Sequence, residues 1–472
     1  MKSMRFFVRA IEVYDAGLAK YPQSLDLAYN KYVFFPKSLF HGEVSPCRIV
    51  VANILSRARV QLEIATHPLL VKQLQASVLS VLEEALASHR YALALDQDNA
   101  DTLFNTSQVL TTIAEELAKD NSHSDQDALQ PLEEALELQN RCLSIQELKH
   151  EQAQAQDDGA LAQTEQHGPN EPTPAMYGGS NPPDSNMLAE QWFSVVEPVT
   201  EDTLIDTALA QLGTMTTLCS ILSSPTVFAP ASSLAWVEEY SSKILNVKLP
   251  MYTKNAGSRL REIAMVRANF VSALLEAGFR SNKVDAATYK RERDGAFDVP
   301  ELNLENSYDS LLANAQSLVA FASALAEPVD SSTHSASRWN ALSAGLASLV
   351  KASKIPGIST DDTAKTHLLR GDSSLAQYQM GQPPTAYPAA ILNAAQLLKN
   401  AEVFYRNASK LASEDQEKAI AGLRSAIAAG LQKGDLGSTI SSANSSRGQD
   451  WLREQVQDMI SEGLLPDNLD KA

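Results

Sequence analysis

The side chains that could act as nucleophiles, bases or metal ligands are few and widely spaced. The three cysteines are Cys47, Cys142 and Cys219, and neither they nor the eight histidines show the spacing of a zinc site or a redox pair. Glycine-rich phosphate loops and the H-E-x-x-H and G-x-S-x-G motifs do not occur. We therefore expect no catalytic residue, no metal site and no cofactor.

Two charged motifs have more ordinary interpretations. Arg370–Asp372 spells an integrin-type tripeptide, but it falls within a predicted helix of a chain without an export signal, so we interpret it as accidental. The basic cluster Lys290–Arg293 could form an anion site, and a solvated helix face is the simpler expectation.

Carboxylates recur in pairs along the predicted helices. They are either solvated faces or an acidic surface that binds a basic client. The pairs are Glu83 and Glu84, Glu115 and Glu116, and Glu133 and Glu134.

Composition favours an all-α fold. Aromatic residues make up 6% of the chain, and alanine and leucine dominate. The chain has 57 acidic and 39 basic side chains, a net charge of −18, which repels phosphate backbones and anionic lipid headgroups. We expect a basic protein partner, no nucleic acid and no membrane. Widely spaced cysteines and the lack of a long apolar run indicate a cytoplasmic or nuclear protein.

Turn signals and prolines divide the chain. The segment from Asp157 to Pro183 has five prolines and no helical periodicity, which predicts a disordered linker over 157–187. The expected regions are N-terminal helices (1–156), this linker, C-terminal helical repeats (188–432), a flexible Gly/Ser connection (433–447), and a capping helix with its tail (448–472). The helix within 129–154 should extend past its packed face into solvent.

Helix starts and stops are readable in the C-terminal part. Thr200 and Ser359 are expected N-caps, and Ser413 with Gln416 matches a capping box. The other expected helices run from Ser258 to a stop at Gly278, from Tyr308 to Leu325, from Trp339 to Lys351 and from Trp451 to Leu465.

A spacing typical of stacked helix pairs occurs three times. Stacked pairs need small residues where two helices cross, a large residue in the next layer and a helix stop, a pattern of the form A-x3-aromatic-x2-A-x4-P. The copies are Ala10, Tyr14, Gly17 and Pro22; Ala85, His89, Ala92 and Gln97; and Ala401, Tyr405, Ala408 and Ser413. We expect these positions to pack rather than react, His89 included.

The segment Y-A-L-A-L-D-Q-D-N-A-D-T-L-F-N around the second copy closely resembles the junction between consecutive tetratricopeptide repeats. Trp339 and Leu342 resemble the opening of another first helix of that family. The resemblance covers about a quarter of the chain and implies an α-solenoid of antiparallel helix pairs interrupted by a linker. Plain helix-pair packing without a binding groove is the alternative.

The resemblance also implies a function. Family members bind peptide ends through a polar clamp. Here Asn105 alone falls at a matching place, a candidate groove residue, whereas Tyr29 and Phe104 depart from the clamp pattern, so we expect the clamp to be absent. The chain therefore resembles acidic, non-enzymatic members that act as scaffolds, assembly factors or escorts of a basic protein. An enzyme with a site built between helices is the alternative.

Residues 32–57 interrupt the first repeat. Joining Lys31 to Ala58 restores a continuous amphipathic helix, and back-translation allows splice signals at both junctions. Our hypothesis is that this segment is a translated intron; an ordinary surface insertion is the alternative. The first predicted helix also lacks its partner, which is expected if an upstream exon is missing.

Overall fold

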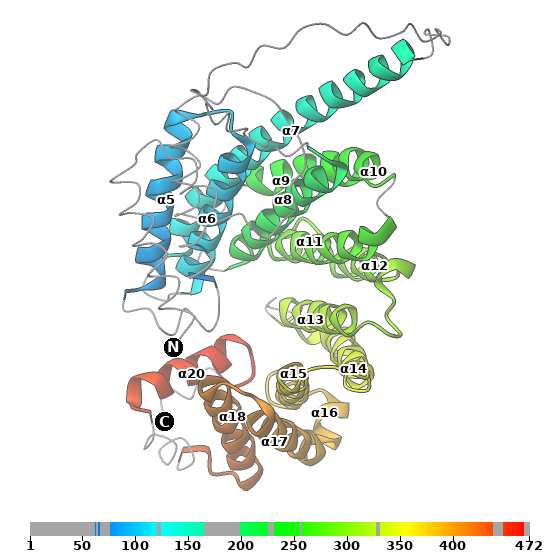
Figure 1. Cartoon of the computed structure of the whole chain (residues 1–472). Coiled ribbons are helices and arrows are strands. Elements are labelled where there is room, and N and C mark those ends of the chain that lie inside the picture. Colours follow the sequence, from blue (N-terminus) through cyan, green and yellow to red (C-terminus); the bar gives the residue numbers. More distant parts are fainter. Residues whose placement is uncertain are drawn as a thin grey trace, which may run out of the picture. The chain divides into compact units, whose positions relative to one another are not determined.

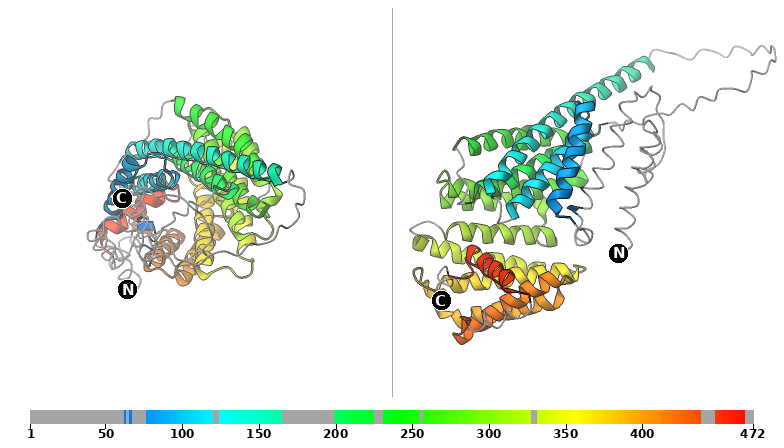
Figure 2. Two further views of the ribbon diagram at one scale, coloured as in Figure 1. Left: turned by 45° about the horizontal axis from the view of Figure 1, so that its top comes forward. Right: turned by 90° about the vertical axis from the view of Figure 1, so that its left-hand side faces the viewer.

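The computed structural model describes residues 62, 65–66, 76–119, 124–164, 199–224, 231–254, 257–326, 331–437 and 447–466. Within these ranges every regular element is a helix, which confirms the all-α prediction (Figures 1 and 2). The chain forms two compact units, Met1–Gly257 and Ser258–Ala472.

Several predictions fall outside the described residues. They concern the first repeat copy (Ala10, Tyr14, Gly17 and Pro22), the segment 32–57, linker residues 165–187 and the core of the Gly/Ser connection, 438–446.

The described part of the first unit is a series of consecutive helices. It contains α5 (Val78–Leu95), α6 (Ala100–Lys119), the 3₁₀ helix η1 (Asp125–Ala128), α7 (Leu129–Thr164), α8 (Glu201–Leu222), α9 (Ala231–Lys243), the π-helix η2 (Ile244–Lys248) and α10 (Leu249–Tyr252). Thr200 caps α8 as expected, because its side chain accepts a hydrogen bond from the Thr203 amide.

Polar contacts fix the directions of α6, α7 and α8. Gln139 of α7 donates to Thr214 of α8 (3.0 Å), and Thr207 of α8 donates to Gln146 of α7 (2.7 Å), so these two helices are antiparallel. Thr111 of α6 lies 3.0 Å from Thr214, and Thr217 donates to Glu115 one turn further along both helices (3.3 Å). Helices α6 and α8 are therefore parallel neighbours.

Helix α9 continues through η2 into α10 because Pro250 prevents an ordinary helical turn. Proline has no amide hydrogen, and its ring clashes with the carbonyl four residues before it. The Leu249 amide instead bonds to Ile244, five residues back. This wide turn keeps Ile244, Leu249 and Tyr252 buried on one face.

Helix α7 extends beyond its packed face, as expected, and is longer than predicted. Its buried residues end near Gln146, and residues 151–155 are exposed. Figure 1 shows the end of α7 extending beyond the neighbouring helices of the first unit. The helix continues to Thr164, so the prediction that the linker begins at Asp157 is wrong. At the edge of the packed part, His150 Nδ1 donates to the carbonyl of Val199 (2.9 Å).

The second unit is also built from consecutive helices. Its elements are the 3₁₀ helix η3 (Gly257–Arg259, at the boundary), α11 (Leu260–Arg280), α12 (Ala286–Phe297), η4 (Pro300–Leu302), α13 (Tyr308–Ala324), η5 (Ser331–His334), α14 (Ser335–Ala352), α15 (Thr360–Gln379), α16 (Pro388–Leu392), α17 (Ala394–Leu411), α18 (Asp415–Lys433) and α20 (Gln449–Ser461).

Side-chain to backbone bonds show that α17 and α18 are antiparallel. Ser409 donates to the carbonyl of Lys418 (2.8 Å), and Ser425 donates to that of Glu402 (3.2 Å). Helix α20 closes one side of this region with an apolar face, as predicted for the last helix. Its buried side chains Leu452, Val456 and Met459 share a core cluster with residues of α15, α17 and α18.

Two local predictions in this unit are wrong, and a third holds for all but one of its residues. Helix α11 does not stop at Gly278, because it continues to Arg280 and the Gly278 carbonyl accepts the amides of the following turn. Ser413 does not cap α18, because its amide and hydroxyl both donate to Asp361 (2.8 and 2.9 Å). In the cluster Lys290–Arg293, the first three residues are exposed, as expected for a solvated face, whereas Arg293 is buried and donates to Ser317 (3.0 Å).

Candidate functional site

A depression of about 400 Å³ lies where the C-terminal ends of α6 and α8 meet. Its α6 residues, Glu115, Ala118 and Lys119, fall on one helix face, as do Thr217 and Ile221 of α8, and Ser224 follows the end of α8. Asp125 of η1 and Ser220 of α8 complete the lining. The parallel contact between α6 and α8 brings these two faces together. We call this depression the α6–α8 pocket.

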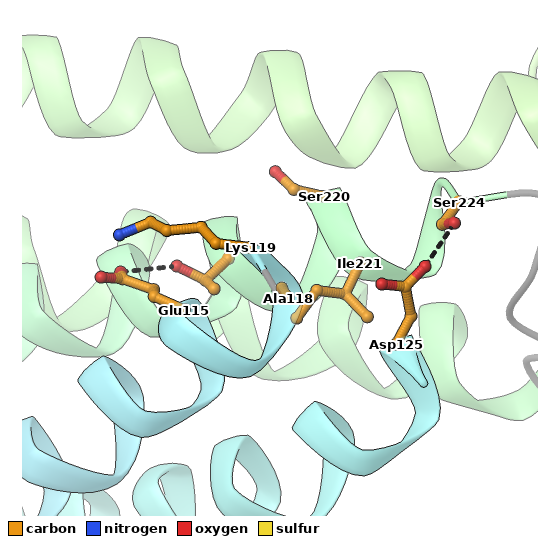
Figure 3. Close-up of a pocket in the computed structure, with 8 residues that line it drawn as sticks. Glu115, Ala118, Lys119, Asp125, Ser220, Ile221 and Ser224 are labelled. Carbon is orange, nitrogen blue, oxygen red and sulfur yellow. Dashed lines mark hydrogen bonds between the residues drawn. The ribbon is translucent and has the colours of Figure 1, made fainter. Parts of the chain in front are cut away.

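The α6–α8 pocket has an apolar centre between two carboxylates. Ala118 and Ile221 lie close together, with Glu115 on one side and Asp125 on the other (Figure 3). Ser224 donates to Asp125 Oδ2 (2.6 Å), and Thr217 donates to Glu115 Oε1 (3.3 Å). Hydroxyl groups therefore hold both carboxylates at the pocket edges.

The electrostatics of the pocket favour a cation. The ends of α6 and α8 bring partial negative charge from helix carbonyls, and Glu115 and Asp125 add full charges. Lys119, which also lines the pocket, pairs with the neighbouring Glu116 (2.7 Å). The apolar centre suits the methylene stem of a lysine or arginine side chain.

No residue lining this pocket is a histidine or a cysteine. Across the described residues, no group of three His, Cys, Asp or Glu side chains could hold a metal ion. The two cysteines within these ranges are buried, and burial raises the pKa of Cys142 and of Cys219 to about 12, which keeps both thiols protonated. The described part of the chain also has no helix that is long and apolar enough to cross a membrane.

A second polar cluster lies inside the second unit. Arg424 of α18 bonds to Asp372 of α15 (2.6 Å) and to Glu462, just after α20 (2.9 Å), and Tyr405 of α17 also donates to Asp372 (2.9 Å). Burial raises the pKa of Asp372, and the Arg424 and Tyr405 donors oppose that shift by stabilising its charged form. This cluster joins four segments and is largely closed to solvent.

The three helical positions of the second and third repeat copies are buried, whereas the stop positions Gln97 and Ser413 are exposed. Ala85, His89 and Ala92 lie on the inner face of α5, and Ala401, Tyr405 and Ala408 on that of α17. Leu342 is buried in α14, and Trp339 is half-buried with its ring 5.6 Å from that of Tyr387.

Asn105, the candidate groove residue, is only 8% exposed on α6. Neighbouring side chains therefore cover most of it, and its role as a groove residue stays a prediction. The residues of the α6–α8 pocket lie a turn or more further along α6 and on α8. Sequence reasoning recognised Glu115 only as one of many helix carboxylates, because α6 and α8 are about a hundred residues apart and no local motif links them.

No family model, curated protein or solved structure matches the chain.

Proposed function

We propose that the protein is a non-enzymatic α-helical scaffold of the tetratricopeptide-like kind that binds a basic segment of a partner protein in the cytoplasm or nucleus. The alternation of antiparallel and parallel neighbours among α6, α7 and α8 supports repeat-like pairing, because stacked hairpins place every second helix parallel. In such a stack, every second helix lines the same surface, and α6 and α8 do so here.

The observation that carries the proposal is the α6–α8 pocket with a carboxylate at each side of an apolar centre. A lysine or arginine of the partner places its charged group at Glu115 or Asp125 and its stem over Ala118 and Ile221. The net charge of −18 extends this preference over longer distances and speeds the approach of a basic partner.

The test uses a fluorescently labelled nine-residue peptide of alternating arginine and alanine, with the full-length chain. We expect binding, measured by fluorescence anisotropy, to weaken steeply between 50 and 300 mM salt, concentrations chosen so that the Debye length falls from about 14 to about 6 Å. A matching peptide of alternating glutamate and alanine should not bind. Binding that is independent of salt would contradict the proposal.

A matched pair of variants tests the pocket itself. Glu115→Gln with Asp125→Asn removes two charges at the pocket, and Glu83→Gln with Glu133→Gln removes two exposed charges of the same unit elsewhere. We expect the pocket variant to bind the arginine peptide roughly 3- to 30-fold more weakly, since each pair contributes about 0.3–1 kcal/mol. An equal loss in both variants would show that only net charge matters.

A further inference from the structure

Helix α9 carries an exposed tryptophan that stacks on a half-buried tyrosine, and the packing of the first unit does not account for the exposed ring. Trp236 is 46% exposed, and its ring stacks on that of Tyr240, with centroids 5.2 Å apart and planes 10° from parallel. Large aromatic side chains are costly to leave in water, and exposed ones often mark recognition sites.

The protein holds the Tyr240 ring in place. Its hydroxyl accepts a hydrogen bond from Gln211 of α8 (2.8 Å) and donates to Asn140 of α7 (3.2 Å). Burial and the charge of Glu147 raise the pKa of Tyr240, so the phenol keeps its proton and this donor role. Val237, which directly follows Trp236 on α9, is fully buried and anchors the helix. The Trp236 ring therefore rests on a fixed support, and a ligand would lose little entropy in ordering it.

Negative charge lies beside the pair. Glu239 is one helical turn from Trp236, and its side chain is 75% exposed. Its contact with Lys243 (3.1 Å) joins two exposed side chains, an ion pair that an incoming cation can replace at small cost. An aromatic face with an adjacent carboxylate is a favourable environment for a guanidinium, which stacks on the ring and bonds to the carboxylate.

We propose that the Trp236–Tyr240 pair, together with Glu239, binds an arginine side chain of the partner protein. This inference rests on the proposed function and adds arginine, rather than any cation, as the preferred residue. It gives the first unit a second contact point on a different helix from those that form the α6–α8 pocket.

The test compares three nine-residue peptides that alternate alanine with arginine, lysine or citrulline. We expect the full-length chain to bind the arginine peptide most tightly, the lysine peptide less tightly and the uncharged citrulline peptide least. Trp236→Leu keeps an apolar side chain and removes the aromatic face, and it should weaken arginine-peptide binding roughly 3- to 30-fold. The affinity of Trp236→Phe for the arginine peptide should lie between that of the unaltered chain and that of Trp236→Leu.

Val247 and Met251 provide the matched control, because both are 56% exposed on the same continuous helix. Val247→Ala with Met251→Ala should leave arginine-peptide binding unchanged. If Trp236→Leu binds as tightly as the unaltered chain, or if citrulline binds as well as arginine, the inference is overturned.

The outcomes separate this inference from the proposed function. If the pocket variant Glu115→Gln with Asp125→Asn weakens binding and Trp236→Leu does not, the arginine site is wrong and the basic-partner proposal stands. If Trp236→Leu weakens binding of the arginine peptide and the pocket variant does not, the proposal that the α6–α8 pocket binds the basic segment is wrong and the arginine-site proposal stands. If none of the peptides binds, both are wrong.

Discussion

The ring of Tyr405 lies directly against the backbone of Gly371. A β-carbon added at Gly371 would come within 2.5 Å of Cδ1 and 2.9 Å of Cζ of that ring, closer than real side-chain contacts allow. The absence of a side chain at Gly371 is therefore what allows α15 and α17 to approach with Tyr405 fully buried between them.

Replacing this glycine should destabilise the second unit. We expect Gly371→Ala to lower the free energy of unfolding by about 1–3 kcal/mol, because the fixed ring must move. Gly422→Ala on α18 is the matched control, since its added carbon meets only Ser409 Oγ at 3.5 Å. That control should gain about 0.5–1 kcal/mol of helix stability. Urea unfolding followed by circular dichroism measures both, and equal effects would contradict the prediction.

The buried ion cluster should depend on Arg424 more than on Glu462. Arg424→Met leaves Asp372 buried without its cation, which should cost about 3–5 kcal/mol of stability. Glu462→Gln should cost under about 1 kcal/mol, because the Glu462 side chain is 47% exposed. Chemical unfolding of the two variants gives the comparison. A Glu462 variant as unstable as the Arg424 variant would show that the last helix depends on that bond.

The polar contacts between α7 and α8 should also contribute to stability. Thr214→Val removes the hydroxyl that accepts from Gln139 and leaves a buried amide donor without this bond, at a cost of about 1–3 kcal/mol. Thr217→Val, at the half-exposed edge of the pocket, should change stability by less than about 0.5 kcal/mol. Adding Gln139→Leu to Thr214→Val should recover part of the loss. No recovery in thermal unfolding would indicate that the valine itself packs badly.

Protonation of His367 should weaken the fold. Burial, and then the charge of nearby Arg370, lower the pKa of His367 below its ordinary value of 6.5. Because the pKa of His367 is lower in the folded than in the unfolded state, its neutral form stabilises the fold. This stabilisation is fully present at a pH above the unfolded-state pKa and is lost as the pH falls through the folded-state pKa. Urea midpoints at pH 8 and pH 5 should therefore differ more for the unaltered chain than for His367→Gln. Parallel changes in both proteins would rule out this histidine as the cause.

Much of the fold was predictable because it depends on local periodicity. The inner positions Ala401, Tyr405 and Ala408 follow from spacing alone, and Thr200 and Ser359 cap their helices because their side chains bond to amides three residues away. Such signals lie within a few turns of one another.

Features that depend on distant partners were not predictable in this way. Gly371 belongs to a tripeptide that we interpreted as accidental. It is needed because the Tyr405 ring, from a helix more than thirty residues away in sequence, packs directly against its backbone. Ser413 matched a capping box, yet Asp361, from the start of another helix, accepts its hydrogen bonds. The α6–α8 pocket is of the same kind, since Glu115 and Thr217 become neighbours only when their helices align.

The bond between His150 and Val199 has a practical consequence for the chain between them. These two residues are 49 positions apart in the sequence, so the hydrogen bond brings two distant points of the chain together. Residues 151–155 of α7, directly after His150, are exposed, and exposed positions of this kind tolerate insertion of a foreign domain whose own ends lie close together. Residues 151–155 are therefore a suitable position for inserting a reporter domain into the first unit.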